Sequence, residues 1–222
     1  MICSPMTDLP IQPPLTRFVQ AFGSFILHAW LGWGFRIRIR RQRAITDDPV
    51  VYACNHRSFA DPPVVGMCSR RPISYFARES LWRVPIIREA LLIMQGIPVD
   101  RVNPGMSSMK GAIARLRGGT SVLIFPEGTR TRSGRLGPLL TGPAMIARRA
   151  GVPVVPIYVH RTEACWPIGS LVPRLCGPRV QVRFGPALRP EPGLDPRQQD
   201  ELTTRRLSVW MHQQERELRP DR

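Results

Sequence analysis

Short apolar runs of strand length alternate with helix-length segments along most of this chain, and this alternation constrains its fold most strongly. Residues 50–54 and 121–125 are typical of the apolar runs, and residues 106–116 and 142–150 of the helical segments. Further strands are predicted at 36–41, 73–77, 97–99, 152–159 and 180–184, and further helices at 79–94 and 198–218. We therefore expect a single α/β domain with a largely parallel central sheet flanked by helices.

The charge of the chain restricts its partners. Its formal net charge is +16, from 32 Lys+Arg against 16 Asp+Glu, and Lys110 is the only lysine. Such an excess implies an anionic partner, which can be nucleic acid, a phospholipid surface or a phosphorylated substrate. The sequence has no recognisable nucleic-acid motif and lacks the interleaved aromatics of a base-stacking platform. We expect an anionic membrane surface and no nucleic acid; a non-catalytic basic module that binds membrane or nucleic acid is the alternative.

The cysteines and the first residues indicate a reducing compartment. The five cysteines include no CxxC pair and no Cys/His cluster of zinc spacing. We therefore predict free thiols, no metal site and no bound cofactor. Residues 1–14 are polar and rich in proline, and we interpret them as an N-terminal tail without a cleaved signal peptide.

Residues 15–35 form an aromatic segment with the period of an amphipathic helix, since Phe18, Phe22 and Phe25 recur at steps of three and four. Five arginines follow it within residues 36–43, which suits a helix lying beside anionic lipid headgroups. We predict a membrane-associating helix that precedes a catalytic domain at 36–222. An ordinary helix packed on the domain and a single membrane span are the alternatives.

A histidine and an aspartate follow the apolar run at 50–54 closely. His56 should emerge at the carboxyl end of that strand, which is where open α/β sheets place their sites. Asp61 lies five residues further on, with Pro62 and Pro63 stiffening a turn behind it. A carboxylate at this spacing can fold back and fix the tautomer of the imidazole, whose other nitrogen can then take a proton from an attacking hydroxyl.

A second polar group closes the strand predicted at 121–125. Glu127, Gly128, Thr129 and Arg130 follow it, so they should lie on the same edge of the sheet as His56. Glycine permits a tight turn, and an arginine guanidinium suits bidentate recognition of phosphate. A turn with a solvated arginine is the simpler interpretation of this group.

Taken together, these residues resemble the glycerolphosphate and lysophospholipid acyltransferases, typified by bacterial 1-acylglycerol-3-phosphate acyltransferase. The family carries four ordered blocks, and the chain matches all of them between about residues 36 and 185. Asn55, His56 and Asp61 match the first; Gly96 and Arg101 match the second. Glu-Gly-Thr-Arg at 127–130 matches the third, and the proline-bearing strand at 152–157 matches the fourth. Four blocks in order make a chance match improbable.

The resemblance implies roles for these residues. His56 is expected to be the general base and Asp61 its orienting partner. Arg101 and the block of Glu127, Gly128, Thr129 and Arg130 are expected to bind the acceptor. One departure is notable: many members carry Phe-Lys where this chain has Leu139 and Leu140.

We therefore expect an O-acyltransferase of phospholipid synthesis. It would move a fatty acyl group from acyl-CoA or acyl carrier protein to the hydroxyl of lysophosphatidic acid, as a peripheral or monotopic protein on the cytoplasmic face of the cell membrane. Another lyso-lipid acceptor, such as lyso-ornithine lipid or a lysophospholipid, is the alternative that the missing lysine keeps open.

Overall fold

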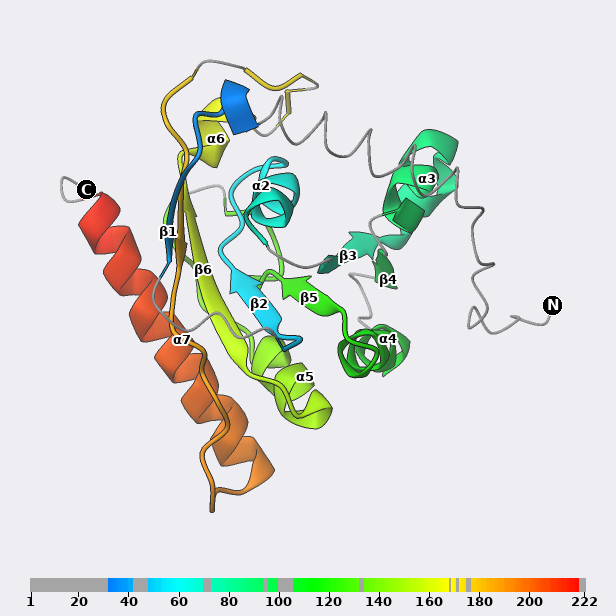
Figure 1. The fold of residues 1–222 in the computed structure, drawn as a ribbon, viewed down its shortest axis with the longest axis vertical. Coiled ribbons are helices and arrows are strands. Elements are labelled where there is room, and N and C mark those ends of the chain that lie inside the picture. Colours follow the sequence, from blue (N-terminus) through cyan, green and yellow to red (C-terminus); the bar gives the residue numbers. More distant parts are fainter. Residues whose placement is uncertain are drawn as a thin grey trace.

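A computed structural model of the chain describes residues 32–41, 48–69, 73–93, 96–99, 106–131, 134–167, 169–170, 172–174 and 177–219. In this part of the chain, strands form one seven-stranded sheet in the order β1-β7-β6-β2-β5-β3-β4 (Figure 1). The strands are β1 (Arg38–Arg41), β2 (Val51–Cys54), β3 (Ile73–Arg78), β4 (Ile97–Val99), β5 (Ser121–Ile124), β6 (Val154–His160) and β7 (Gln181–Phe184).

The sheet is largely parallel, as the alternation of elements predicts. Strands β6, β2, β5, β3 and β4 all run in one direction. At the other edge β7 is antiparallel to β6, and β1 follows the direction of β7. A reversed edge pair of this kind is common on otherwise parallel sheets. The site therefore has to be sought at the carboxyl ends of the parallel strands.

Residues 32–34 are helical. The other helices of the described residues are α2 (Asp61–Cys68), the 3-10 helix η1 (Glu79–Arg83), α3 (Pro85–Ile93), α4 (Met106–Arg117), α5 (Gly142–Ala150), α6 (Thr162–Cys165) and α7 (Pro196–Leu218). Helices α4, α5 and α7 confirm the sequence predictions within two residues. The single helix predicted at 79–94 is divided, because Val84 before Pro85 is extended and the proline starts a new helix.

Helix α2 was not among the predicted helices. Pro62 and Pro63, which we interpreted as a stiff turn, instead occupy its first turn. Proline is well suited to that position, since its fixed φ matches the helix and the N–H it lacks has no partner inside the first turn. The result matters for the site, because Asp61 is the first residue of α2.

Two apolar clusters of buried side chains cover the two faces of the sheet. Tyr52 and Cys54 point toward α2, whereas Val51 and Ala53 point toward α4, α5 and α7. All four side chains are buried, which explains why β2 is a continuous apolar run rather than an alternating one. Asn55 is therefore the first polar residue after this strand.

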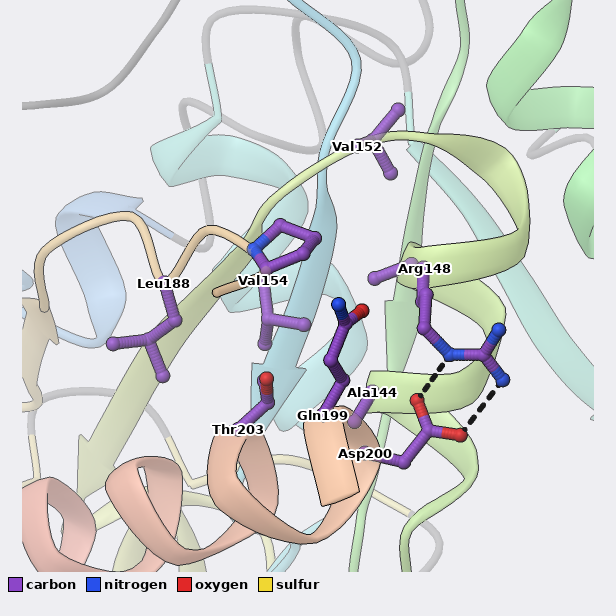
Figure 2. A pocket seen from close by; sticks show the side chains of 10 residues that line it. Ala144, Arg148, Val152, Val154, Leu188, Gln199, Asp200 and Thr203 are labelled. Atoms are coloured by element: carbon purple, nitrogen blue, oxygen red, sulfur yellow. Dashed lines mark hydrogen bonds and ion pairs between the residues drawn. The ribbon is translucent and has the colours of Figure 1, made fainter. Parts of the chain in front are cut away.

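Helix α7 is fixed against α5 near its start. Asp195 caps the helix by accepting from Arg197 and Gln198 N–H groups. Arg148 of α5 binds both carboxylate oxygens of Asp200 at 2.9 Å, as Figure 2 shows. The space enclosed beside this pair measures about 10 Å³, which is room for a single water molecule. This end of α7 is thus a packing contact.

Most of the predicted membrane-associating helix, residues 15–31, and the tail at 1–14 lie outside the described residues. Of its last residues, Phe35 is fully buried and Trp33 is exposed. Within the described ranges, no helix combines the length and the apolar character needed to cross a membrane.

Candidate active site

Asn55 follows β2 directly, and its side chain forms hydrogen bonds with the backbone of the neighbouring strand β6. Its amide nitrogen donates to the Val159 carbonyl at 2.9 Å, and its amide oxygen accepts from the Val159 N–H at 2.7 Å. The side chain is completely buried. This bond to β6 fixes where the next residue, His56, emerges from the sheet.

The structure brings His56 and Asp61 together. The Nδ1 atom of His56 lies 2.9 Å from Oδ2 of Asp61, which is fully buried. The same oxygen accepts from the backbone N–H groups of Arg57 at 2.6 Å and Ser58 at 2.8 Å. Because the carboxylate can only accept, Nδ1 carries the proton and Nε2 keeps a free lone pair. A neutral imidazole in this tautomer is ready to take a proton at Nε2.

Phe125 fixes the plane of the imidazole. The two rings are stacked, with centroids 3.8 Å apart and planes 16° apart. Phe125 follows β5 directly, and β5 is the parallel neighbour of β2. The expectation that the two polar groups lie on one edge of the sheet is therefore confirmed.

The Glu127 carboxylate contacts main chain on both sides. One oxygen accepts from the His56 N–H at 2.8 Å and the other from the Gly137 N–H at 3.2 Å. Burial raises the pKa of Glu127, although these two bonds and the charge of Arg57 oppose the rise. These contacts make Glu127 a support for the backbone of His56, and its role in binding the acceptor stays a prediction.

Gly128 and Thr129 line a cavity of about 440 Å³ into which His56 also projects. Gly128 has φ of 71°, a value that favours glycine. The remaining walls are mainly apolar and come from β3, β4, β5, α4, α5 and the loop before α5: Phe76, Val99, Met109, Ile124, Leu140, Met145 and Ile146. The cavity is within the range of about 300–1,000 Å³ typical of small-molecule sites. A base and an apolar chamber thus share one space.

Arg130 stacks on an aromatic side chain beside this cavity. Its guanidinium carbon lies 3.9 Å from the centre of the Phe59 ring, which is 48% exposed. Phe59 lies between His56 and Asp61 in sequence, so one loop holds both the imidazole and the arginine. Arg101, the other predicted acceptor-binding arginine, lies outside the described residues.

Arg57 is a site residue that the sequence reasoning missed. Its side chain is only 2% exposed and donates to the Tyr158 hydroxyl at 2.8 Å and to Glu215 at 2.7 Å. Its position inside the first block was a signal, because an arginine beside a buried base needs a counter-ion. The partner could not be predicted, since Glu215 is 158 residues away.

Known proteins with similar sequences share one named activity. The family described as Acyltransferase matches residues 36–160. A 1-acyl-sn-glycerol-3-phosphate acyltransferase of Pseudomonas aeruginosa is 32% identical over 95% of this chain and 82% of its own length. A chloroplastic 1-acyl-sn-glycerol-3-phosphate acyltransferase of Brassica napus is 35% identical over 74% of this chain, which spans 50% of that relative.

A solved structure shares the fold. The 1-acyl-sn-glycerophosphate acyltransferase PlsC of Thermotoga maritima superposes with a TM-score of 0.63, covering 88% of each chain at 19% identity. The family match covers more than half of the chain and includes both polar groups of the site. The resemblance read from the four sequence blocks is therefore confirmed, and this chain belongs to the acyltransferase family.

Proposed function

We propose that this enzyme transfers a fatty acyl group from a thioester donor to the free hydroxyl of lysophosphatidic acid, 1-acylglycerol-3-phosphate, in phospholipid synthesis. One observation carries the proposal: the His56–Asp61 pair opens into a largely apolar cavity. The names of the Pseudomonas and Brassica relatives support this choice of acceptor.

His56 would act as the general base. The acceptor hydroxyl donates its proton to Nε2 as its oxygen attacks the thioester carbonyl. The new ester bond forms, the carbon–sulfur bond breaks, and the imidazolium returns the proton to the leaving thiolate. Asp61 keeps the imidazole in the required tautomer and stabilises its positive charge, as the aspartate does in a serine-hydrolase triad. The proton that leaves the hydroxyl ends on the released thiol, so this reaction requires neither a metal nor a bound cofactor.

The apolar part of the cavity would hold the acyl chain. The side chains that line this part offer dispersion contacts and no hydrogen bonds. Such a surface suits a hydrocarbon chain better than a polar ligand. The thioester carbon would then lie near His56, at the polar end. Acyl-CoA and acyl carrier protein both present such a thioester, so both are candidate donors.

The acceptor phosphate would be bound by arginine. Arg130 is held beside the cavity by its contact with Phe59, which fixes the direction of a guanidinium fork. Gly128 and Thr129 would contact the acceptor from the same turn, and we propose Arg101 as a second phosphate ligand on the basis of the family block. Glu127 would act on the acceptor indirectly, through the backbone of His56.

The charge of the protein favours work at a lipid surface. A net charge of +16 would attract the protein to an anionic lipid surface, where a lyso-lipid acceptor would be within reach. We propose a peripheral or monotopic association with the cytoplasmic face of the cell membrane and no nucleic-acid partner. Residues 15–35 remain the predicted anchor.

One feature favours a second acceptor class. Leu140, which stands where many relatives carry lysine, is 60% exposed and lines the cavity. An apolar side chain at this place would not repel an acceptor without phosphate, such as lyso-ornithine lipid, and another lysophospholipid also remains a candidate.

An acceptor panel tests the proposal. Purified enzyme would receive acyl-CoA or acyl carrier protein together with lysophosphatidic acid, lyso-ornithine lipid or lysophosphatidylethanolamine, and products would be identified by mass spectrometry. We expect phosphatidic acid to form fastest. If only lyso-ornithine lipid, which has no phosphate, were acylated, it would replace lysophosphatidic acid as the proposed acceptor. If none of the donor and acceptor pairs gave an acylated lipid, the proposed activity would be refuted.

A further inference from the structure

The strongest unassigned feature of the molecule is the charged cluster behind the loop of His56. Arg57 is buried there against Tyr158 of β6 and Glu215 of α7, and Nη1 lies 3.7 Å from Glu163 of α6. A buried guanidinium without a close carboxylate is strongly destabilising, so Glu215 is its main counter-ion. The last turns of α7, outside the matched residues 36–160, therefore reach the loop that carries the base.

Glu215 holds a second loop with the same atom. Its Oε1 accepts from Arg57 at 2.7 Å and from the Leu136 N–H at 3.0 Å. The next residue, Gly137, donates its N–H to Glu127, and Glu127 accepts from the His56 N–H. Hydrogen bonds and chain connections thus form a closed ring that runs from His56 through Glu127, Leu136–Gly137, Glu215 and Arg57 back to His56.

The ring also reaches the orienting carboxylate. The Arg57 N–H donates to Asp61 Oδ2 at 2.6 Å, the shortest of the three bonds to that oxygen. Displacement of Arg57 would therefore move both the backbone of His56 and one of the donors that fix Asp61. Because a displacement of about 1 Å from a productive geometry can cost a hundredfold in rate, this link matters for turnover.

We propose that Glu215 is a positioning residue for His56, acting through Arg57 and Leu136. This inference rests on the proposed function. Helix α7 would then have two separate roles. Its first turns pack on α5, and its last turns fix the loop that carries His56.

The same helix supplies a matched control. Glu215 and Asp200 both belong to α7, both pair with an arginine, and their side chains are 16% and 12% exposed. The ion pair of Asp200 with Arg148 joins α7 to α5 (Figure 2). Neither of its residues lines the cavity of His56. Losing either carboxylate should lower stability, but only Glu215 is connected to the base.

The test compares Glu215→Gln with Asp200→Asn in kcat, in donor KM and in thermal unfolding, at a temperature where both remain folded. In Glu215→Gln the guanidinium loses its close counter-ion and is drawn toward Glu163. We expect its kcat to fall about tenfold with donor KM within about twofold, whereas Asp200→Asn keeps the wild-type kcat. Glu215→Ala, which also removes the acceptor of Leu136, should lose more.

Unchanged kcat in Glu215→Gln, or equal loss in both variants, would overturn the inference. A readout independent of turnover is the imidazole NMR signal of His56, identified by its absence in His56→Ala. It should shift in Glu215→Gln and stay in place in Asp200→Asn; an unshifted signal would contradict the inference even if no acyl transfer were found. A wild type that acylates no lyso-lipid refutes only the proposed function.

Discussion

The two ends of the His56 cavity are held in place by different forces. At the polar end, hydrogen bonds fix Nδ1 and the backbone N–H of His56, Oδ2 of Asp61 and both carboxylate oxygens of Glu127. At the apolar end, side chains such as Ile124 and Ile146 are positioned by packing alone. Directional bonds specify a geometry, whereas packing specifies a volume. Changes at the polar end should therefore alter rate, and changes at the apolar end should alter substrate choice.

His56→Ala should have the largest effect. Removing the base should lower kcat by about 10² to 10⁴-fold, the range of general acid–base catalysis. The same substitution removes the stacking contact with Phe125, and we expect this loss to lower the free energy of unfolding only slightly. Acyl transfer at saturating substrates is the measurement, with circular dichroism as the control for folding. Activity within a few-fold of wild type would show that the polar end does not act through His56.

Glu127→Gln comes next. Its amide can accept only one of the two N–H groups that Glu127 now accepts, from His56 and Gly137. An unmet buried donor costs about 1–3 kcal/mol, and the backbone of the base would lose its support. We expect a loss of about tenfold in kcat with acceptor KM little changed. A selective rise in acceptor KM would instead assign Glu127 to substrate binding.

The pH dependence of stability offers a second test of the same carboxylate. Because burial raises the pKa of Glu127, the folded state binds its proton more tightly than the unfolded state does. The stability that this proton contributes is present at low pH and is lost as pH rises from about 4.3 through the raised pKa. Relative to Glu127→Gln, the wild type should therefore lose unfolding free energy over this window. Denaturant titrations at several pH values check this, and a relative gain would contradict it.

At the apolar end, Ile146→Phe should change selectivity more than rate. The side chain is buried on α5 and lines the cavity, so a larger ring takes space from the acyl chain. We expect kcat/KM for long-chain donors to fall about tenfold relative to short-chain donors. Donors of graded length give the measurement. A uniform loss across all lengths would indicate general damage and would break the distinction between the two ends.

The smallest effect is expected at Leu140, where the two ends meet. Leu140→Lys places a cation at a position that is 60% exposed, where an ion pair contributes about 0.2–1 kcal/mol. The KM for lysophosphatidic acid should fall by up to about fivefold. Lyso-ornithine lipid serves as the control acceptor, and an equal change for both acceptors would exclude a contact with phosphate.

Much of the fold and the polar end could be predicted because local patterns determine them. The apolar run at 50–54 predicted a buried strand, which the structure has at Val51–Cys54, and the polar residues after it emerge at its carboxyl end. Neighbouring parallel strands then bring His56 and Glu127 together. Helix α2 was not predicted, because proline is compatible with both a loop turn and the first turn of a helix.

The support behind the site could not be predicted for a different reason. The partners of Arg57 come from β6 and α7, far along the chain, and an arginine-rich sequence offers many possible pairs. Only the packing of α7 against the sheet selects Glu215 among the carboxylates of that helix. The apolar cavity likewise arises from α4, α5 and three strands, and no single segment encodes it.

The central claim is that His56 and Asp61 act as one catalytic unit. Its most direct test compares the residual acyl-transfer rates of His56→Ala, Asp61→Asn and the double variant, measured as phosphatidic acid by mass spectrometry. Residues that act as a unit are not additive, so we predict that the double variant is no slower than His56→Ala alone. Multiplied losses in the double variant would mean that Asp61 works independently of His56, and would contradict the claim.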